Sequence, residues 1–144
     1  LIYSKLSSLH NTKIIPVETE RDSNGLALSS RNNLLSISEK KEASIIFKGL
    51  NSLRKEIKVN KSLNIYNYLN DFYNQNKLIE VEYILTEKLS VFNEKNIFIN
   101  DLFWGKECRV VMVAAKISGV RLIDNLIINW NIQIQDKVLL YQHM

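Results

Sequence analysis

A glycine turn that leads into two hydroxyls and a guanidinium is the part of this sequence best suited to chemistry. Asn24 and Gly25 form the turn signal, and Ser29, Ser30 and Arg31 follow shortly after it. Hydroxyls and backbone amides donate hydrogen bonds to phosphate oxygens, and arginine adds a permanent positive charge in a planar, bidentate fork. A polyphosphate group needs this kind of positioning and charge neutralisation. The pattern therefore indicates an anion-binding loop, although the same composition is also that of an ordinary solvated loop.

The remaining candidates for chemistry are isolated side chains. His10 and His143 stand at opposite ends of the chain, and neither has a cysteine or histidine at metal-ligand spacing. Cys108 has no neighbouring base and suits a small buried apolar position. Asp124 and Asn125 fit either a polar site or a turn at the end of a strand, and we favour the turn. Because no glycine-rich phosphate motif of the common kinds occurs either, we expect neither a catalytic residue nor a metal ligand in this chain.

The bulk properties are those of a single soluble domain. The chain has 144 residues, of which 46% are hydrophobic and 24% charged, with a formal net charge of +4. This charge favours an anionic ligand, but Lys and Arg lack the clustering typical of nucleic-acid binding. No apolar run reaches the ~18–20 residues of a membrane span, and a single cysteine suits a reducing compartment. We therefore expect a cytoplasmic protein that binds neither nucleic acid nor a membrane. Because the chain starts with Leu1, either an upstream part is missing or the start was processed.

Two amphipathic helices are predicted in the first half of the chain. Ser36 and Glu39 have the S-x-x-E spacing of a capping box, which predicts that a helix begins there. Ser62 is the expected cap of a second helix, which should end at residues 74–76. Apolar residues recur at helical spacing, so each helix should bury one face. These stripes are Ala43, Ile46, Leu50, Leu53 and Ile57 in the first helix, and Ile65, Leu69 and Phe72 in the second.

The second half of the chain reads as a small antiparallel sheet. Val81, Tyr83 and Leu85 alternate with other residues, which predicts a strand on which these three side chains share one mostly apolar face. Residues 109–116 form a nearly continuous apolar run, as in a strand covered on both faces. A tight turn and a hairpin partner follow over residues 118–124.

These helices and strands predict an α+β fold, with two or more helices on a small antiparallel sheet. Before it, residues 1–10 show a short helical stripe and residues 14–17 a β-type run, which together resemble the end of an α/β unit. Residues 97–99 suggest a further short strand or edge. Residues 126–144 contain a strand-like alternation, and their last part fits a terminal helix equally well.

Three blocks of the sequence together resemble the pantothenate synthetases. Residues 19–32 read TERDSNGLALSSRN, where that family typically has Thr-Val-Arg-Glu, one variable residue, Asp or Asn, and Gly-Leu-Ala-Met/Leu-Ser-Ser-Arg-Asn. Leu35 and Ser36, with Glu39 after them, are similar to the family's Leu-Ser-x-x-Glu helix entry. Residues 114–125 are similar to its Ala-Ala-x-x-Gly-x-Thr-Arg-Leu-Ile-Asp-Asn ending. The spacing between the blocks is also family-like, and the match covers most of the chain.

The resemblance implies an ATP-dependent ligase. Family members adenylate pantoate with ATP and Mg2+, release pyrophosphate, and let β-alanine attack the acyl adenylate. The ATP-binding loop that holds the triphosphate corresponds by position to Leu28, Ser29, Ser30 and Arg31. Glu20 occupies the place whose backbone meets adenine. Because the family usually has Val there, we expect a main-chain contact at this position.

The resemblance also divides the chain. Residues 1–21 correspond to the last helix and strand of a Rossmann-like nucleotidyltransferase domain, residues 22–125 to the smaller C-terminal lid domain, and residues 126–144 to an extra tail. The family's HIGH-like helix start, its pantoate-binding glutamines and its Gly-x-Lys-Asp segment lie upstream of the matched part. We therefore expect the C-terminal portion of a pantothenate synthetase, inactive alone, which acts on pantoate and β-alanine together with an N-terminal half. Family members are commonly dimers, so a homodimer is a further expectation.

Two other functions stay open as alternatives. The same loop could bind a nucleotide or a partner surface without turnover, as a non-catalytic binding module. An RNA-binding domain is the third hypothesis, and it depends only on the mild positive charge.

Overall fold

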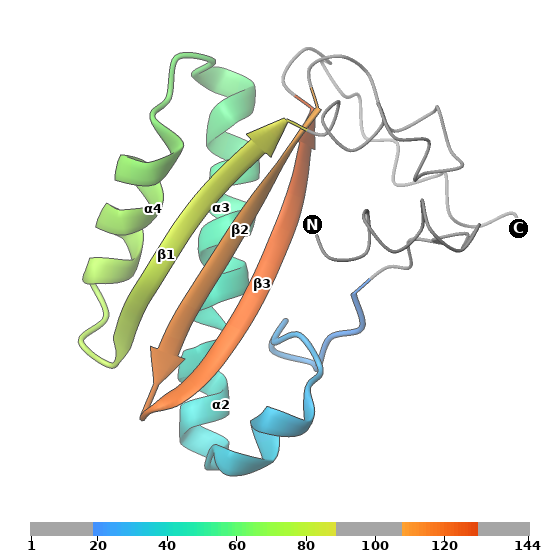
Figure 1. Cartoon of the computed structure of the whole chain (residues 1–144), viewed down its shortest axis with the longest axis vertical. Helices are drawn as coiled ribbons and strands as arrows, with labels where there is room; N and C mark the ends of the chain where they lie inside the picture. The colour runs from blue at the N-terminus through green and yellow to red at the C-terminus, as the bar shows by residue number, and fades with distance from the viewer. Residues whose placement is uncertain (1–18, 89–107, 130–144) are drawn as a thin grey trace, which may run out of the picture.

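The computed structural model describes residues 19–88 and 108–129, which form an α+β fold. A short 3-10 helix and the α-helices come first, and the strands follow (Figure 1). The elements are η1 (Ser30–Leu34), α2 (Ile37–Ala43), α3 (Ile45–Val59), α4 (Ile65–Asn74), β1 (Ile79–Lys88), β2 (Cys108–Ile117) and β3 (Val120–Asn129). In this described part, no helix has both the length and the apolar character needed to cross a bilayer.

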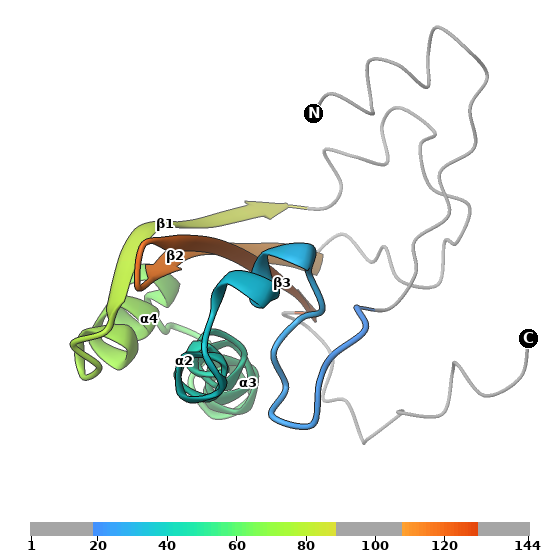
Figure 2. The same ribbon diagram turned by 90° about the horizontal axis from the view of Figure 1, so that it is seen from below.

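The strands form one antiparallel sheet in the order β1-β2-β3, so β2 is the central strand. Figure 2 shows α3 and α4 together on one face of this sheet. The two layers confirm the predicted arrangement of helices on a small antiparallel sheet. The predicted helix and strand within residues 1–17, the short strand at 97–99 and the two alternatives for the end of the chain lie outside the described residues.

Ser36 begins α2 with the predicted capping box. Its hydroxyl accepts a hydrogen bond from the Glu39 amide at 3.3 Å, and the Glu39 carboxylate accepts one from the Ser36 amide at 2.8 Å. The single helix predicted from this point is broken at Ser44. Ser44 is fully buried, and its hydroxyl donates to the carbonyl oxygen of Lys41 at 2.6 Å. A serine that bonds to the preceding turn competes with regular helix geometry, so α2 and α3 replace the one helix expected.

The cap of α4 is Asn64, and the prediction of Ser62 is wrong. The Asn64 side chain accepts a hydrogen bond from the Asn67 amide at 3.0 Å. Ser62 instead belongs to the preceding turn, where its amide donates to the side chain of Asn60 at 3.1 Å. Asparagine is as good an N-cap as serine, so the choice between the two depends on where the turn ends.

The predicted apolar stripes of α3 and α4 form the core. Every residue predicted for the first stripe is buried, and so are Ile65 and Leu69 of the second, whereas Phe72 is partly buried. Tyr73 is fully buried as well, and burial first, then the charge of Asp124, raise the pKa of its hydroxyl above the usual value. The sheet side of this core includes Val111, Val113, Ala115 and Ile117.

Strand β1 departs from the predicted alternation. Its pairing with β2 shifts register between Val81 and Tyr83, as at a β-bulge. Beyond a bulge, side chains change face relative to the earlier alternation. Ile84 is therefore buried, with 7% of its surface exposed, whereas Leu85 is 50% exposed. The prediction that Val81, Tyr83 and Leu85 share one apolar face is wrong for this reason.

The outer face of the sheet is more open at β3 than at β2. None of residues 109–116 is exposed, and Ala114, which lies between the core residues Val113 and Ala115, is 0% exposed, so the coverage of β2 on both faces stays a prediction. Neighbours along a strand point to opposite faces, and Leu122 and Leu126 of β3 point into the core. Ile123 and Ile127 therefore lie on the other face, where they are 57% and 44% exposed.

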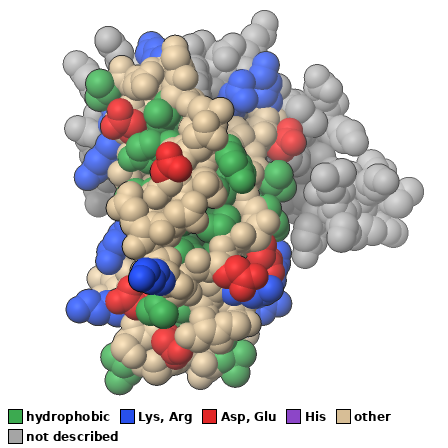
Figure 3. Space-filling view, turned by 90° about the vertical axis from the view of Figure 1, so that its left-hand side faces the viewer, with side chains coloured by type: hydrophobic (Ala, Val, Ile, Leu, Met, Phe, Trp, Pro, Cys, Tyr) green, Lys and Arg blue, Asp and Glu red, His purple; other side chains and the backbone are tan. Residues whose placement is uncertain are grey.

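Charged side chains are mixed with apolar and polar ones on the face of the molecule seen in Figure 3. At the sheet surface, Glu82 accepts a hydrogen bond from Arg121 and pairs with Lys116 at 3.3 Å. The hydrogen bond from Arg121 is the main cause that lowers the pKa of Glu82. Lys116 also pairs with Glu80 at 3.6 Å, so the cluster of two carboxylates and two cations balances its charges locally, and it is exposed enough to be screened by salt.

The β2–β3 hairpin turns where predicted, at Ser118 and Gly119, whose φ angles are 50° and 79°. Positive φ at both central residues is typical of a two-residue hairpin turn. β3 then continues well past Asp124, which pairs with Val113 in the middle of the strand. The prediction of a strand-end turn at Asp124 is therefore wrong. A buried carboxylate is tolerated here because Arg21 neutralises it.

Candidate functional site

The candidate loop, residues 19–32, begins as a tight hairpin held by backbone hydrogen bonds. The amide of Asp22 donates to the carbonyl oxygen of Leu26 at 2.9 Å, and the amide of Leu28 donates to that of Glu20 at 2.8 Å. These bonds fix the path of the chain immediately before the two serines.

The turn of this hairpin requires glycine. The Asp22 side chain accepts hydrogen bonds from the amides of Asn24 and Leu26 at 2.8 and 3.0 Å, which closes the turn locally. Gly25 has a φ of 90°, and a Cβ atom at this position would lie 2.6 Å from the Phe47 ring. Backbone conformation and close approach to α3 both exclude a larger residue. The turn signal read from the sequence is therefore confirmed.

The predicted phosphate-binding side chains are all open to solvent. Leu28, Ser29, Ser30 and Arg31 are all exposed. Ser29 caps η1, and its hydroxyl accepts a hydrogen bond from the Arg31 amide at 3.2 Å. Among the residues that the structure describes, no carboxylate pairs with the Arg31 guanidinium. These side chains are thus free to meet a ligand from outside.

Two hollows flank the candidate loop and share Leu28, Ser29 and Asn32. The first has a volume of about 500 Å³, and its lining is Asp22, Leu28, Ser29, Ser30, Asn32, Asn33 and Lys40. The second has a volume of about 280 Å³ and lies between the loop, α3 and β3. Its charged lining residues are Arg31, Arg121 and Asp124.

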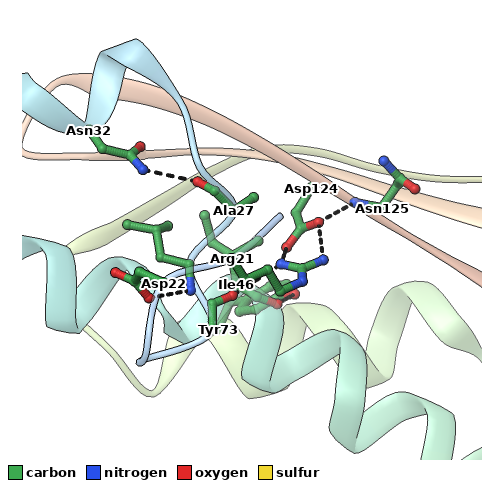
Figure 4. Close-up of polar contacts among 10 residues, drawn as sticks. Arg21, Asp22, Ala27, Asn32, Ile46, Tyr73, Asp124 and Asn125 are labelled. Carbon is green, nitrogen blue, oxygen red and sulfur yellow. Dashed lines mark hydrogen bonds and ion pairs between the residues drawn. The ribbon is translucent and has the colours of Figure 1, made fainter. Parts of the chain in front are cut away.

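Asn32 lies under the loop with one unpaired acceptor. Its side-chain amide nitrogen donates to the carbonyl oxygen of Ala27 at 2.9 Å, which fixes the orientation of the amide (Figure 4). Its Oδ1 atom is buried and has no hydrogen-bond partner. Since Asn32 lines both hollows, a hydrogen-bond donor on a ligand is a suitable partner for this oxygen.

A bidentate ion pair holds the hairpin against the sheet. The Arg21 guanidinium donates to the two carboxylate oxygens of Asp124 at 2.7 and 2.9 Å (Figure 4). The side chains of Arg21 and Asp124 are 17% and 5% exposed. The sequence offered no local signal for this pair, because the two residues are 103 positions apart. Both nevertheless fall in blocks that carry the family resemblance.

Glu20 lies in the first arm of the hairpin, with an exposed side chain. Its carbonyl oxygen accepts the hydrogen bond from Leu28, so that part of its main chain is engaged within the loop. The adenine contact expected for the Glu20 main chain stays a prediction. Within the two described ranges, no group of three or more His, Cys, Asp or Glu side chains is placed to hold a metal ion.

The candidate loop lies within a segment of the chain that matches a known protein family. A family model described as pantoate-beta-alanine ligase matches residues 5–127. The chain belongs to the pantoate-beta-alanine ligase family. This confirms the resemblance to pantothenate synthetases, and with it a ligase family of pantothenate biosynthesis.

The relatives extend well beyond this chain. The pantothenate synthetase of Wigglesworthia glossinidia brevipalpis is 38% identical over 121 residues, which cover 81% of this chain and 40% of the relative. That of Cytophaga hutchinsonii is 36% identical over 126 residues, with the same coverage. A crystal structure of pantothenate synthetase from Thermus thermophilus matches with a TM-score of 0.57 and 23% identity, over 78% of this chain and 38% of that one. The chain thus spans about 40% of the length of the curated relatives it matches, and the structural match shows the shared fold.

Proposed function

We propose that this chain supplies the ATP-phosphate loop of a pantoate–β-alanine ligase that works through a pantoyl adenylate. The observation that carries the proposal is the joint exposure of Ser29, Ser30 and Arg31 beside the two hollows, with no carboxylate on Arg31 in the described part of the chain. A cation and hydroxyl donors at the start of a 3-10 helix suit a polyphosphate ligand. Membership of the pantoate-beta-alanine ligase family supports ATP as that ligand.

In the proposed reaction, a carboxylate oxygen of pantoate attacks the α-phosphorus of ATP, and the bond to the leaving pyrophosphate breaks. The amine of β-alanine then attacks the acyl carbon, and AMP leaves with its bonding electrons. The loop acts in the first step. The hydroxyls of Ser29 and Ser30 donate hydrogen bonds to the phosphate oxygens, and Arg31 offsets the charge that grows on pyrophosphate.

Mg2+ is expected to accompany ATP. This ion prefers oxygen ligands and is often held by one or two carboxylates together with substrate phosphates. Asp22 contributes a carboxylate to the first hollow, but its Oδ1 atom is already engaged by two backbone amides. The described residues therefore do not form a metal site of their own.

The pantoate-binding residues are proposed to come from a polypeptide that matches the N-terminal part of the relatives. This chain aligns with about 40% of their length, and the resemblance implies that the family's pantoate-binding motifs belong to the remainder. By this proposal, the chain alone binds ATP but makes no pantothenate.

An ATP titration of the chain tests the loop directly. Arg31→Ala should weaken ATP binding about tenfold or more, because a charge-assisted hydrogen bond contributes about 1.5–3 kcal/mol. Lys61→Ala is the matched control, since it removes one positive charge from an exposed turn before α4. If both variants weaken binding equally, general electrostatic attraction explains it and the loop has no specific role.

Complementation tests the reaction. The chain mixed with a matching N-terminal half should release pyrophosphate only when both ATP and pantoate are present, and Arg31→Ala should slow this release. ATP binding without activity in any soluble, folded mixture would contradict the ligase proposal. That result would favour the alternative, a non-catalytic nucleotide-binding module.

A further inference from the structure

Arg21 connects the turn of the candidate loop to both layers of the fold. Its bidentate ion pair with Asp124 reaches β3. Its Nη1 atom also donates to the carbonyl oxygen of Gly25 at 3.1 Å, inside the turn. On the α3 side, the guanidinium carbon lies 3.8 Å from the centre of the Phe47 ring. The side chain therefore makes a hydrogen bond, an ion pair and a cation–π contact at once.

Because the Arg21–Asp124 ion pair is buried, it favours a single position of the hairpin against β3 and α3. The Asp124 side chain is only 5% exposed, and a buried carboxylate that loses its partner is strongly unfavourable. A planar guanidinium can satisfy both carboxylate oxygens while it stacks on an aromatic ring, which an ammonium group cannot do. Any position of the hairpin that breaks this contact is therefore disfavoured.

Arg21 acts on a ligand only through the loop. It is not among the described residues that line either hollow. Its bond to Gly25 fixes the turn, and the bond from Leu28 to Glu20 closes the hairpin directly before Ser29. The position of the serine hydroxyls thus depends on how the hairpin stands against β3 and α3.

We propose that Arg21 is a positioning residue for ATP, with Asp124 as its anchor. The inference depends on the proposed function of the loop, and it adds that the Arg21–Asp124 pair holds the loop in the ATP-binding arrangement. The pair thereby joins the candidate loop to β3, which lies far from the loop in the sequence.

The test uses the full chain with Arg21→Lys and Asp124→Asn. Arg21→Lys keeps the charge but loses the planar fork, and Asp124→Asn is the second variant if Arg21→Lys does not fold. Glu80→Gln is the control, because it removes one partner of the exposed ion pair with Lys116 on the same sheet. Hydrogen exchange by NMR follows the Leu28 amide and the amides of β2, and an ATP titration gives the dissociation constant.

We expect exchange at Leu28 to become about tenfold faster relative to β2, and the dissociation constant of ATP to rise about tenfold, in both variants but not in the control. With the N-terminal half added, KM for ATP should rise and kcat should fall, because the loop offsets charge that grows during the reaction, while KM for pantoate stays close to that of the unmodified chain. Equal acceleration at Leu28 and in β2 would mean a general stability role and would overturn the inference. So would faster exchange at Leu28 with unchanged ATP affinity.

If the unmodified chain binds no ATP, the proposed function fails, and the ATP part of this inference fails with it. The exchange ratio still decides whether Arg21 places the loop, so the two failures are distinguishable.

Discussion

The hydroxyl of Tyr73 on α4 donates a hydrogen bond to the carbonyl oxygen of Ile46 on α3, at a distance of 2.9 Å. Tyr73 is fully buried, and its ring lies against Gly49, one helical turn beyond Ile46. The two helices that cover the sheet are therefore joined at one point by a polar bond and a close steric contact. This contact also holds α3 against α4, and α3 carries Phe47, whose ring lies under Arg21 of the candidate loop.

Tyr73→Phe tests the polar part of this contact. The substitution keeps the ring and removes one buried hydrogen bond, so the free energy of unfolding should fall by about 1 kcal/mol. Urea denaturation followed by circular dichroism measures this change. Tyr66→Phe is the matched control, because Tyr66 lies on the same helix and is 56% exposed. Equal effects of the two substitutions would mean that the hydrogen bond to Ile46 contributes nothing specific.

Gly49→Ala tests the steric part. In an exposed helix this change stabilises by about 1 kcal/mol, because alanine has the higher helix propensity. Here the new Cβ atom would lie 2.5 Å from the Tyr73 ring, and overfilling a tight core costs about 1–3 kcal/mol. We expect the cost of the clash to exceed the gain in helix propensity, so thermal or urea denaturation should show a net loss of stability. In a Tyr73→Leu background the ring is gone, so Gly49→Ala should then stabilise; a loss of similar size in both backgrounds would contradict this account.

Glu39 should make the protein sensitive to acid. Hydrogen bonds from the Ser118 side chain, then from the backbone and side chain of Ser36, lower the pKa of its carboxyl to about 2. A carboxyl group with a lower pKa in the folded state contributes stability above the unfolded value of about 4.5. That contribution should be lost as the pH falls from about 4.5 to about 2. Urea denaturation across this range is the measurement, and Glu39→Gln should flatten the pH dependence there.

Ser118→Ala separates the contributions to this acid sensitivity. It removes the largest cause of the low pKa while leaving the capping box intact, so the loss of stability in acid should become smaller but persist. A Glu39→Gln curve that runs parallel to that of the unmodified chain would show that other groups cause the acid sensitivity.

The helices could be predicted from the sequence because the forces that form them are local. Apolar spacing selects the buried stripe, and the Ser36 box depends on residues three apart. The division at Ser44 depends on how one buried hydroxyl bonds, which the spacing of apolar residues does not reveal. The same limit explains the cap of α4, where two good capping residues lie close together.

The site was only partly predictable. The composition of the loop identified Ser29, Ser30 and Arg31, and the structure shows them exposed together. The spacing of residues does not reveal the contact that holds the loop, because Arg21 and Asp124 are 103 positions apart and meet only through the tertiary fold. Asp124 by itself looks like a turn residue, and only its partner explains a carboxylate in the middle of a strand.

Ile84 and Leu85 provide the last test, because sequence alternation and structure predict opposite outcomes for them. The bulge between Val81 and Tyr83 places Ile84 in the core and turns Leu85 outward, with 7% and 50% of their surfaces exposed. Ile84→Ala should therefore lower the free energy of unfolding by about 2–5 kcal/mol, since it empties a buried site. Leu85→Ala, as its matched control, should change it by only about 0.5 kcal/mol. Urea denaturation of both variants decides the matter: a larger effect at Leu85 would mean that β1 runs without the bulge and that Val81, Tyr83 and Leu85 face the helices after all.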